Sequence, residues 1–194
     1  TASVRNLVQT IQRENKDVLG VIRPPFSLMT GFIGTASLNI ALSKNKRHDL
    51  AYGLLQQTSY PSWLYSIDNG ATTIWERLNS YTIENGFGGN NSMNSFNHYS
   101  FGSVAAWMYR YSLGIQRDPK VAAFKKFILQ PTPDPERKMK WAKGYYNSSY
   151  GKIESAWEWN TTGWDYRAVI PPNTTAVFKI EQATPKQVLL EGKR

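Results

Sequence analysis

The first part of the chain, up to about residue 117, repeats its apolar residues at the spacing of an amphipathic helix. Near the start of the chain, one helical face carries Val4, Leu7, Val8 and Ile11. The same period recurs over residues 101–108, on a face formed by Phe101, Val104, Ala105 and Met108. Apolar side chains at intervals of three and four residues predict helices that each bury one side.

Between these two helices, the pattern predicts an antiparallel helical pair. Its helices are expected over residues 35–43 and 49–57, and the polar link at residues 44–48 supplies the turn. A last helix is expected to begin near residues 95–97 and to stop at Gly114, because glycine readily takes the left-handed conformation that ends many helices.

The segment between residues 59 and 94 does not look like part of a plain helical bundle. It is rich in Gly, Asn and Thr, which weaken helices. Residues 79–94 are therefore expected to be mostly loop. A long irregular segment of this kind is better explained as the rim or floor of a site.

Beyond Pro119 the period changes from helical to two. The clearest strand pattern places one set of side chains on a single face: Ile153, Ser155, Trp157 and Trp159. Residues 166–170 and 176–180 alternate in the same way, and the Pro-Pro-Asn segment at 171–173 makes a turn between them. Short strands separated by turn residues predict an antiparallel β-sandwich.

Helices followed by strands predict an α+β chain with two domains. The first domain is expected to cover residues 1–118 and the second residues 119–194. The hydrophobic content of 41% is sufficient for a substantial core. The aromatic content of 13% suits either that core or the faces of sugars.

Charge and cysteine content exclude several classes of site. The chain carries a net charge of +9, and residues 116–143 hold eight cationic against three acidic side chains. No nucleic-acid module accompanies this run, so a solvated basic face is expected and nucleic acid is not an expected partner. The chain has no cysteine and only two histidines, and no zinc-site spacing is present, so neither a metal nor a cofactor is expected. No apolar run is long enough for a membrane span.

Three stretches of the first part carry a family resemblance. They are Thr-Gly-Phe-Ile-Gly-Thr at 30–35, Tyr-Pro-Ser-Trp at 60–63 running on to Gly-Ala-Thr-Thr-Ile-Trp-Glu-Arg at 70–77, and Asn-His-Tyr-Ser-Phe-Gly at 97–102. In this order they resemble the end of the catalytic domain of bacterial α-L-rhamnosidases of glycoside hydrolase family 78. Residues 169–176 resemble the close of that family's C-terminal β-domain.

The resemblance implies that the helical part is the end of an (α/α)6 barrel of twelve helices, of which the chain holds about the last five. It also implies an inverting hydrolase acting on a rhamnose-containing carbohydrate. Leu64 and Leu78 stand where the family often has Gly and Trp, which bears on the shape of the sugar pocket. The chain begins with Thr, as a processed product or a fragment would.

Glu76 is the residue that the resemblance makes the general base. Inversion requires a second carboxyl group as general acid, and that group lies in an earlier part of the family's barrel. The missing N-terminal part is therefore an expected partner, and the chain alone is expected to be inactive. Without the resemblance, Glu76 is interpreted as an ordinary surface carboxylate or one that is ion-paired beside Arg77.

His98 matches a family position that contacts bound rhamnose, and an imidazole can donate a hydrogen bond to a sugar hydroxyl. The alternative is a histidine that caps the start of a helix. Trp75 and Trp63 are candidates for stacking on a sugar, although aromatic residues beside helices more often belong to the core.

Two other functions remain open on the sequence. One is a related (α/α)6 glycosidase with a different sugar, since a fold does not fix the substrate. The other is a non-catalytic carbohydrate-binding or scaffold piece. For a bacterial source, we expect a periplasmic or secreted protein rather than a cytoplasmic one.

Overall fold

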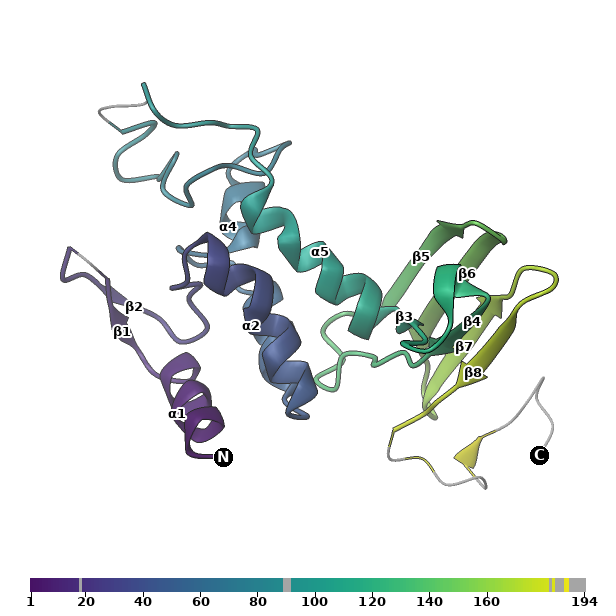
Figure 1. The fold of residues 1–194 in the computed structure, drawn as a ribbon. Helices are drawn as coiled ribbons and strands as arrows, with labels where there is room; N and C mark the ends of the chain where they lie inside the picture. Colours follow the sequence, from purple (N-terminus) through teal and green to yellow (C-terminus); the bar gives the residue numbers. More distant parts are fainter. Residues whose placement is uncertain (18, 89–91, 182, 184–186, 189–194) are drawn as a thin grey trace. The chain divides into compact units, whose positions relative to one another are not determined.

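The computed structural model of the 194-residue chain describes residues 1–17, 19–88, 92–181, 183, 187 and 188. The chain divides into two compact units, Thr1–Trp107 and Met108–Arg194. Figure 1 shows the α-helices in the first unit and the long strands in the second, so the predicted α+β class is confirmed.

The first unit opens with helix α1 (Ala2–Ile11), whose predicted apolar spacing is confirmed. The Thr1 hydroxyl caps this helix by accepting the N–H of Val4 at 3.4 Å. A short hairpin follows, formed by β1 (Asn15–Lys16) and β2 (Ile22–Arg23). Arg23 lies 2.8 Å from the Asp17 carboxylate in this hairpin.

Helices α2 (Phe32–Lys44) and α3 (His48–Leu55) form the predicted antiparallel pair. Their contact buries Leu42, Leu50 and Leu54 almost completely. Within the same contact, the side-chain amide of Asn39 donates to the Ala51 carbonyl at 3.0 Å. Helix α4 (Trp63–Asp68) is short and is capped by Ser62, whose hydroxyl accepts the N–H of Tyr65.

The predicted start of the last helix was wrong. The chain makes a 3-10 turn, η1 (Ser100–Ser103), before helix α5 (Val104–Trp107), which continues into a π-helical turn, η2 (Met108–Ser112). Residues 95–98 are not helical because their backbone bonds to residues 74–76 instead. The predicted left-handed end is confirmed, since Gly114 has a φ of +73°.

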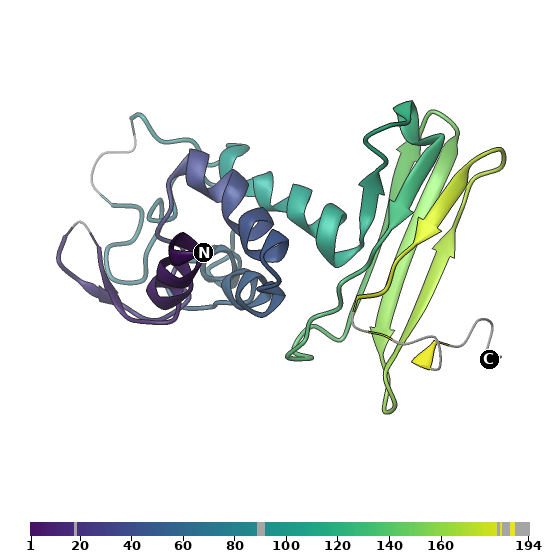
Figure 2. The ribbon, with the colours of Figure 1, turned by 60° about the horizontal axis from the view of Figure 1, so that its bottom comes forward.

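The second unit contains two three-stranded sheets, seen together in Figure 2. One holds β3 (Ile115–Arg117), β4 (Lys126–Leu129) and β8 (Thr175–Phe178), with a short 3-10 turn, η3 (Ala122–Phe124), before β4. The other holds β5 (Trp141–Ser148), β6 (Gly151–Trp159) and β7 (Trp164–Val169). Neighbouring strands are antiparallel except β4 and β8, which pair in parallel.

Side chains from both sheets meet in one core of the second unit. Its buried members are Leu113, Ile115, Phe127, Leu129 and Ile153. Strand β6 alternates as predicted, with Ile153, Ser155 and Trp157 buried. The Ser155 hydroxyl donates to the Leu113 carbonyl at 2.6 Å, and the Trp157 indole N–H donates to the Ser112 carbonyl at 2.8 Å.

The first strand of the second unit, β3, begins earlier than the change of period at Pro119 suggested. β3 lies over Ile115–Arg117 and pairs with β4, so residues expected at the end of the helical domain lie in the sheet. The two compact units accordingly meet between Trp107 and Met108. The domain limits of 1–118 and 119–194 stay a prediction, because compactness does not test whether each part folds alone.

Gly114, between η2 and β3, offers a test of packing within the second unit. A Cβ atom there would lie 2.1 Å from both the Gln130 carbonyl carbon and the Pro131 nitrogen. We expect Gly114→Ala to destabilise the chain by about 2–4 kcal/mol through overpacking and left-handed strain. Gly163→Ala is the control, because nothing lies within 4 Å of its Cβ position. Equal urea midpoints for the two variants would contradict this account.

Asp49 in the first turn of α3 offers a test of pH dependence. Hydrogen bonds from Arg47, at 3.0 and 2.7 Å, lower the pKa of the Asp49 carboxyl. A lowered folded-state pKa contributes stability at neutral pH that is lost as the pH falls through that pKa. We expect Asp49→Asn to cost about 0.5 kcal/mol at pH 7, the size of a partly exposed ion pair. The difference from wild type should vanish in acid, whereas Asp68→Asn, an exposed control, should change little at either pH.

Candidate functional site

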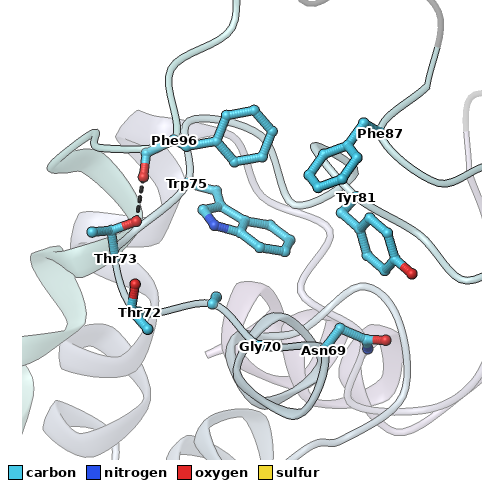
Figure 3. A pocket seen from close by; sticks show the side chains of 9 residues that line it. Asn69, Gly70, Thr72, Thr73, Trp75, Tyr81, Phe87 and Phe96 are labelled. Atoms are coloured by element: carbon cyan, nitrogen blue, oxygen red, sulfur yellow. Dashed lines mark hydrogen bonds between the residues drawn. The ribbon is translucent and has the colours of Figure 1, made fainter.

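A cavity of about 430 Å³ lies in the irregular part of the first unit, where the sequence predicted a rim or floor. Figure 3 shows it from close by. It is lined by Asn69, Gly70, Ala71, Thr72, Thr73, Trp75, Tyr81, Phe87 and Phe96. The wall therefore combines four aromatic rings with the Gly-Ala-Thr-Thr stretch that carried the family resemblance.

The four rings hold each other edge to face. Trp75 lies 5.6 Å from Phe96 and 6.5 Å from Tyr81 between ring centroids, and Phe87 lies 5.1 Å from Tyr81 and 5.7 Å from Phe96. Such edge-to-face contacts stabilise aromatic clusters beyond the burial of their area. Trp75 is only 8% exposed, so most of its side chain is packed within the unit.

Backbone bonds join residues 73–76 to residues 95–98, and we call this pairing the loop clasp. The Glu76 N–H donates to the Ser95 carbonyl at 2.8 Å, and the His98 N–H donates to the Ile74 carbonyl at 2.7 Å. The Thr73 hydroxyl also donates to the Phe96 carbonyl, as Figure 3 shows. The clasp orders two loop segments that belong to no regular helix or sheet.

Glu76 is held at one end of the loop clasp. Its Oε2 accepts the Ser95 N–H at 2.7 Å, and its side chain is half-buried. It follows Trp75 directly, yet it is not among the residues that line the cavity. Among the described residues no ion pair joins it to Arg77, whose guanidinium donates to the Met93 carbonyl at 2.6 Å. The alternative of a Glu76–Arg77 ion pair therefore has no support in the structure.

His98 lies at the other end of the loop clasp, between two rings. Its imidazole stacks on Phe32 at 4.9 Å and on Tyr99 at 5.2 Å. Its Nδ1 accepts the Ser100 N–H at 3.3 Å, so in the neutral ring the proton is on Nε2. The predicted capping role is present, and Nε2 is a hydrogen-bond donor. Like Glu76, His98 does not line the cavity.

Trp63 lies in the core of the first unit. It is 7% exposed, and its indole N–H donates to the Phe101 carbonyl at 2.8 Å. This gives it a packing role, and the predicted sugar contact finds no support in the geometry. Tyr81, Phe87 and Phe96 also line the cavity but were not predicted from the sequence. The available signal was their presence in a Gly- and Asn-rich loop, where no helix face requires an aromatic side chain.

The described residues hold no group of three or more side chains that could bind a metal ion. Within the same residues, no helix has the length and hydropathy needed to cross a membrane.

Comparisons with known proteins account for both units. Residues 7–112 match the bacterial α-L-rhamnosidase six-hairpin glycosidase domain, and residues 114–193 match the bacterial α-L-rhamnosidase C-terminal domain. An α-L-rhamnosidase of Alteromonas sp. is 42% identical over 78% of this chain and 16% of its own length. One of Formosa agariphila is 43% identical over 79% of this chain, again 16% of its own length.

Solved structures give the same result. The Streptomyces avermitilis α-L-rhamnosidase complexed with L-rhamnose superposes with a TM-score of 0.71 and 38% identity, over 79% of this chain and 14% of that one. The Aspergillus terreus enzyme gives 0.71 and 30% identity, over 90% of this chain and 18% of that one. The chain thus spans about a sixth of the length of the curated relatives it matches.

Proposed function

This chain belongs to the bacterial α-L-rhamnosidase family, and we propose that it serves as the end of the catalytic barrel in an enzyme that releases terminal α-L-rhamnose with inversion. The observation that supports this most is the position of Glu76. Its carboxylate is fixed by the Ser95 N–H, directly beside the Trp75 that lines the aromatic cavity.

The proposed role of Glu76 is to take a proton from the attacking water. An inverting hydrolase needs one carboxylate for this step and a carboxylic acid roughly 6.5–9.5 Å away to protonate the leaving oxygen. A general base must be ionised and oriented. The Ser95 N–H supports the second condition, because its hydrogen bond to Oε2 orients the carboxylate. We assign Oε1 to the water and place the general acid outside this chain.

His98 and Trp75 are proposed to bind the sugar. The proton on His98 Nε2 can be donated to a hydroxyl, while the ring stays fixed between Phe32 and Tyr99. Rhamnose is a 6-deoxy sugar with an apolar methyl group, and the aromatic wall around Trp75 suits such a group. Both contacts require the rest of the barrel to close the site.

Glu76→Gln tests the general base in the intact protein that carries this chain. The amide keeps the size of the side chain and can still accept the Ser95 N–H, but it cannot take a proton from water. We expect kcat on an aryl α-L-rhamnoside to fall by about 100-fold or more, the usual contribution of a positioned base. Glu84→Gln, a change of an exposed glutamate in the same loop region, should leave kcat unchanged. A near-normal rate in Glu76→Gln would remove Glu76 from the mechanism.

Substitution of His98 separates binding from chemistry. We expect His98→Ala in the intact protein to lower kcat/KM about tenfold, the value of one hydrogen bond to a sugar hydroxyl. His98→Gln retains an N–H donor and should recover part of the loss. Equal losses in both variants would indicate that the ring stacking, rather than the donor, is what matters.

The 194-residue chain by itself should not hydrolyse an aryl α-L-rhamnoside, because it lacks the proposed acid. Turnover by the purified chain that disappears in Glu76→Gln would place both carboxyl groups within it. Comparison of aryl rhamnoside with aryl glucoside and glucuronide in the intact protein tests the sugar. A preference for either of the latter would favour the related glycosidase of different specificity.

A further inference from the structure

The outer face of the β5-β6-β7 sheet carries a hollow that the proposed catalysis does not use. Its volume is about 530 Å³, and its lining includes Trp141, Lys143, Glu154, Ala156, Glu158 and Arg167. No described residue of the opposite sheet lines it. Successive side chains of a strand point to opposite faces. Since Ile153, Ser155 and Trp157 of β6 are buried inside, Glu154, Ala156 and Glu158 point outward.

The register of the sheet gives the hollow a small floor and polar walls. Ala156 lies opposite Lys143 on β5 and opposite Arg167 on β7. Adjacent strands are about 4.8 Å apart, so the two cationic residues stand on strands roughly 10 Å apart with only a methyl group between them. In the described part of the chain, neither Lys143 nor Arg167 forms a side-chain hydrogen bond or an ion pair. After the hydrogen bond from Lys152, both charges nevertheless help to lower the pKa of Glu154.

The next row of the sheet combines an exposed indole with two carboxylates. Trp141 is 62% exposed and lies opposite Glu158, which in turn lies opposite Asp165. Like charges directly opposite each other destabilise a sheet. The Asn160 side-chain amide donates to one oxygen of Asp165 at 3.0 Å, whereas the Glu158 carboxylate accepts no hydrogen bond from the described residues. This row therefore offers hydrogen-bond acceptors beside a flat apolar surface.

Charge balance indicates which ligand this face suits. Three cations, Lys143, Lys152 and Arg167, face three acids, Glu154, Glu158 and Asp165, and Lys152 lies 2.6 Å from Glu154. A polyanion needs a surplus of positive charge, and this face has none although the whole chain carries +9. A neutral polyhydroxylated molecule can use donors and acceptors together and stack its apolar side on an indole.

We propose that this hollow is a second saccharide-binding site, which takes a neutral glycan chain. The sugar ring stacks on Trp141, its hydroxyls donate to Glu158 and Asp165, and Lys143 and Arg167 donate to ring or hydroxyl oxygens above Ala156. The site goes beyond the proposed catalysis and does not require it. Binding here keeps the protein on its polymer, which raises the local concentration of chain ends.

Affinity electrophoresis of the intact protein that carries this chain tests the proposal. Gels that contain galactomannan or arabinoxylan, both neutral, are compared with gels that contain polygalacturonate, an anionic polymer. We expect at least one neutral polymer to retard the protein to an extent that added salt does not change. Retardation by polygalacturonate alone, lost in salt, would mean general attraction to the basic chain and would overturn the proposal. No retardation by either neutral polymer would also overturn it.

Two variants test whether the neutral polymer binds to this face of the sheet. Trp141→Ala removes the stacking surface and should weaken retardation about tenfold, as expected for a central aromatic contact. Ala156→Ile raises the floor with a residue that favours strands, so it should weaken binding without loss of thermal stability. Lys138→Ala, at an exposed position outside the hollow, is the control for a surface substitution elsewhere and should leave retardation by the neutral polymer unchanged. Neutral-polymer binding that is equal in wild type, Trp141→Ala and Ala156→Ile would place it elsewhere and overturn the proposal.

Aryl α-L-rhamnoside hydrolysis, measured on the same variants, keeps the two proposals apart. We expect Trp141→Ala to hydrolyse this small substrate at the wild-type rate. Retardation without any hydrolysis would contradict the proposed function and leave the second site intact. Hydrolysis without retardation would contradict the second site and leave the proposed function intact.

Discussion

The loop clasp is the constraint on which the candidate site depends. Residues 73–76 and 95–98 lie in irregular chain, so neither helix nor sheet bonding fixes their backbone. Their mutual bonds do so instead, from Glu76 to Ser95 and from His98 to Ile74. The clasp brings Trp75 beside Phe96, and the Ser95 N–H also holds the carboxylate of Glu76. The same pairing of loops therefore positions part of the aromatic wall and the proposed base.

In the second unit, strand β6 has one face in the core and the other on the outer hollow. One face of this strand carries Ile153, Ser155 and Trp157 into the core, where Ser155 and Trp157 also bond to the carbonyls of Leu113 and Ser112. Tyr166 packs beside Ser155, and burial raises the pKa of its hydroxyl to about 12. The opposite face is then left to charged residues around Ala156. Because these inner contacts anchor β6, the side chains on its outer face keep a fixed spacing along the hollow.

The prediction of helices and strands succeeded where the pattern was long and failed where other bonds competed. The α2–α3 pair and the alternation of β6 followed from periodicity. The last helix was predicted too early, because residues 95–98 bond to a distant loop that no local pattern reveals. Residues 176–180 were predicted to alternate, and Phe178 stacks on Tyr166 of the other sheet at 4.9 Å although it is 45% exposed. It lies at the end of β8, where fewer neighbours cover a side chain.

The sequence by itself determined the class of fold, the family and the segments that carry the candidate site, because hydrophobic periods and the Trp-Glu and Asn-His motifs are local features of the chain. The tertiary structure alone decided which aromatic residues line a cavity. It placed Trp63 in the core, brought Tyr81, Phe87 and Phe96 to Trp75, and joined Glu76 to Ser95. The physical reason is that these contacts join residues far apart in sequence, and their partners are selected by packing and hydrogen bonding rather than by spacing.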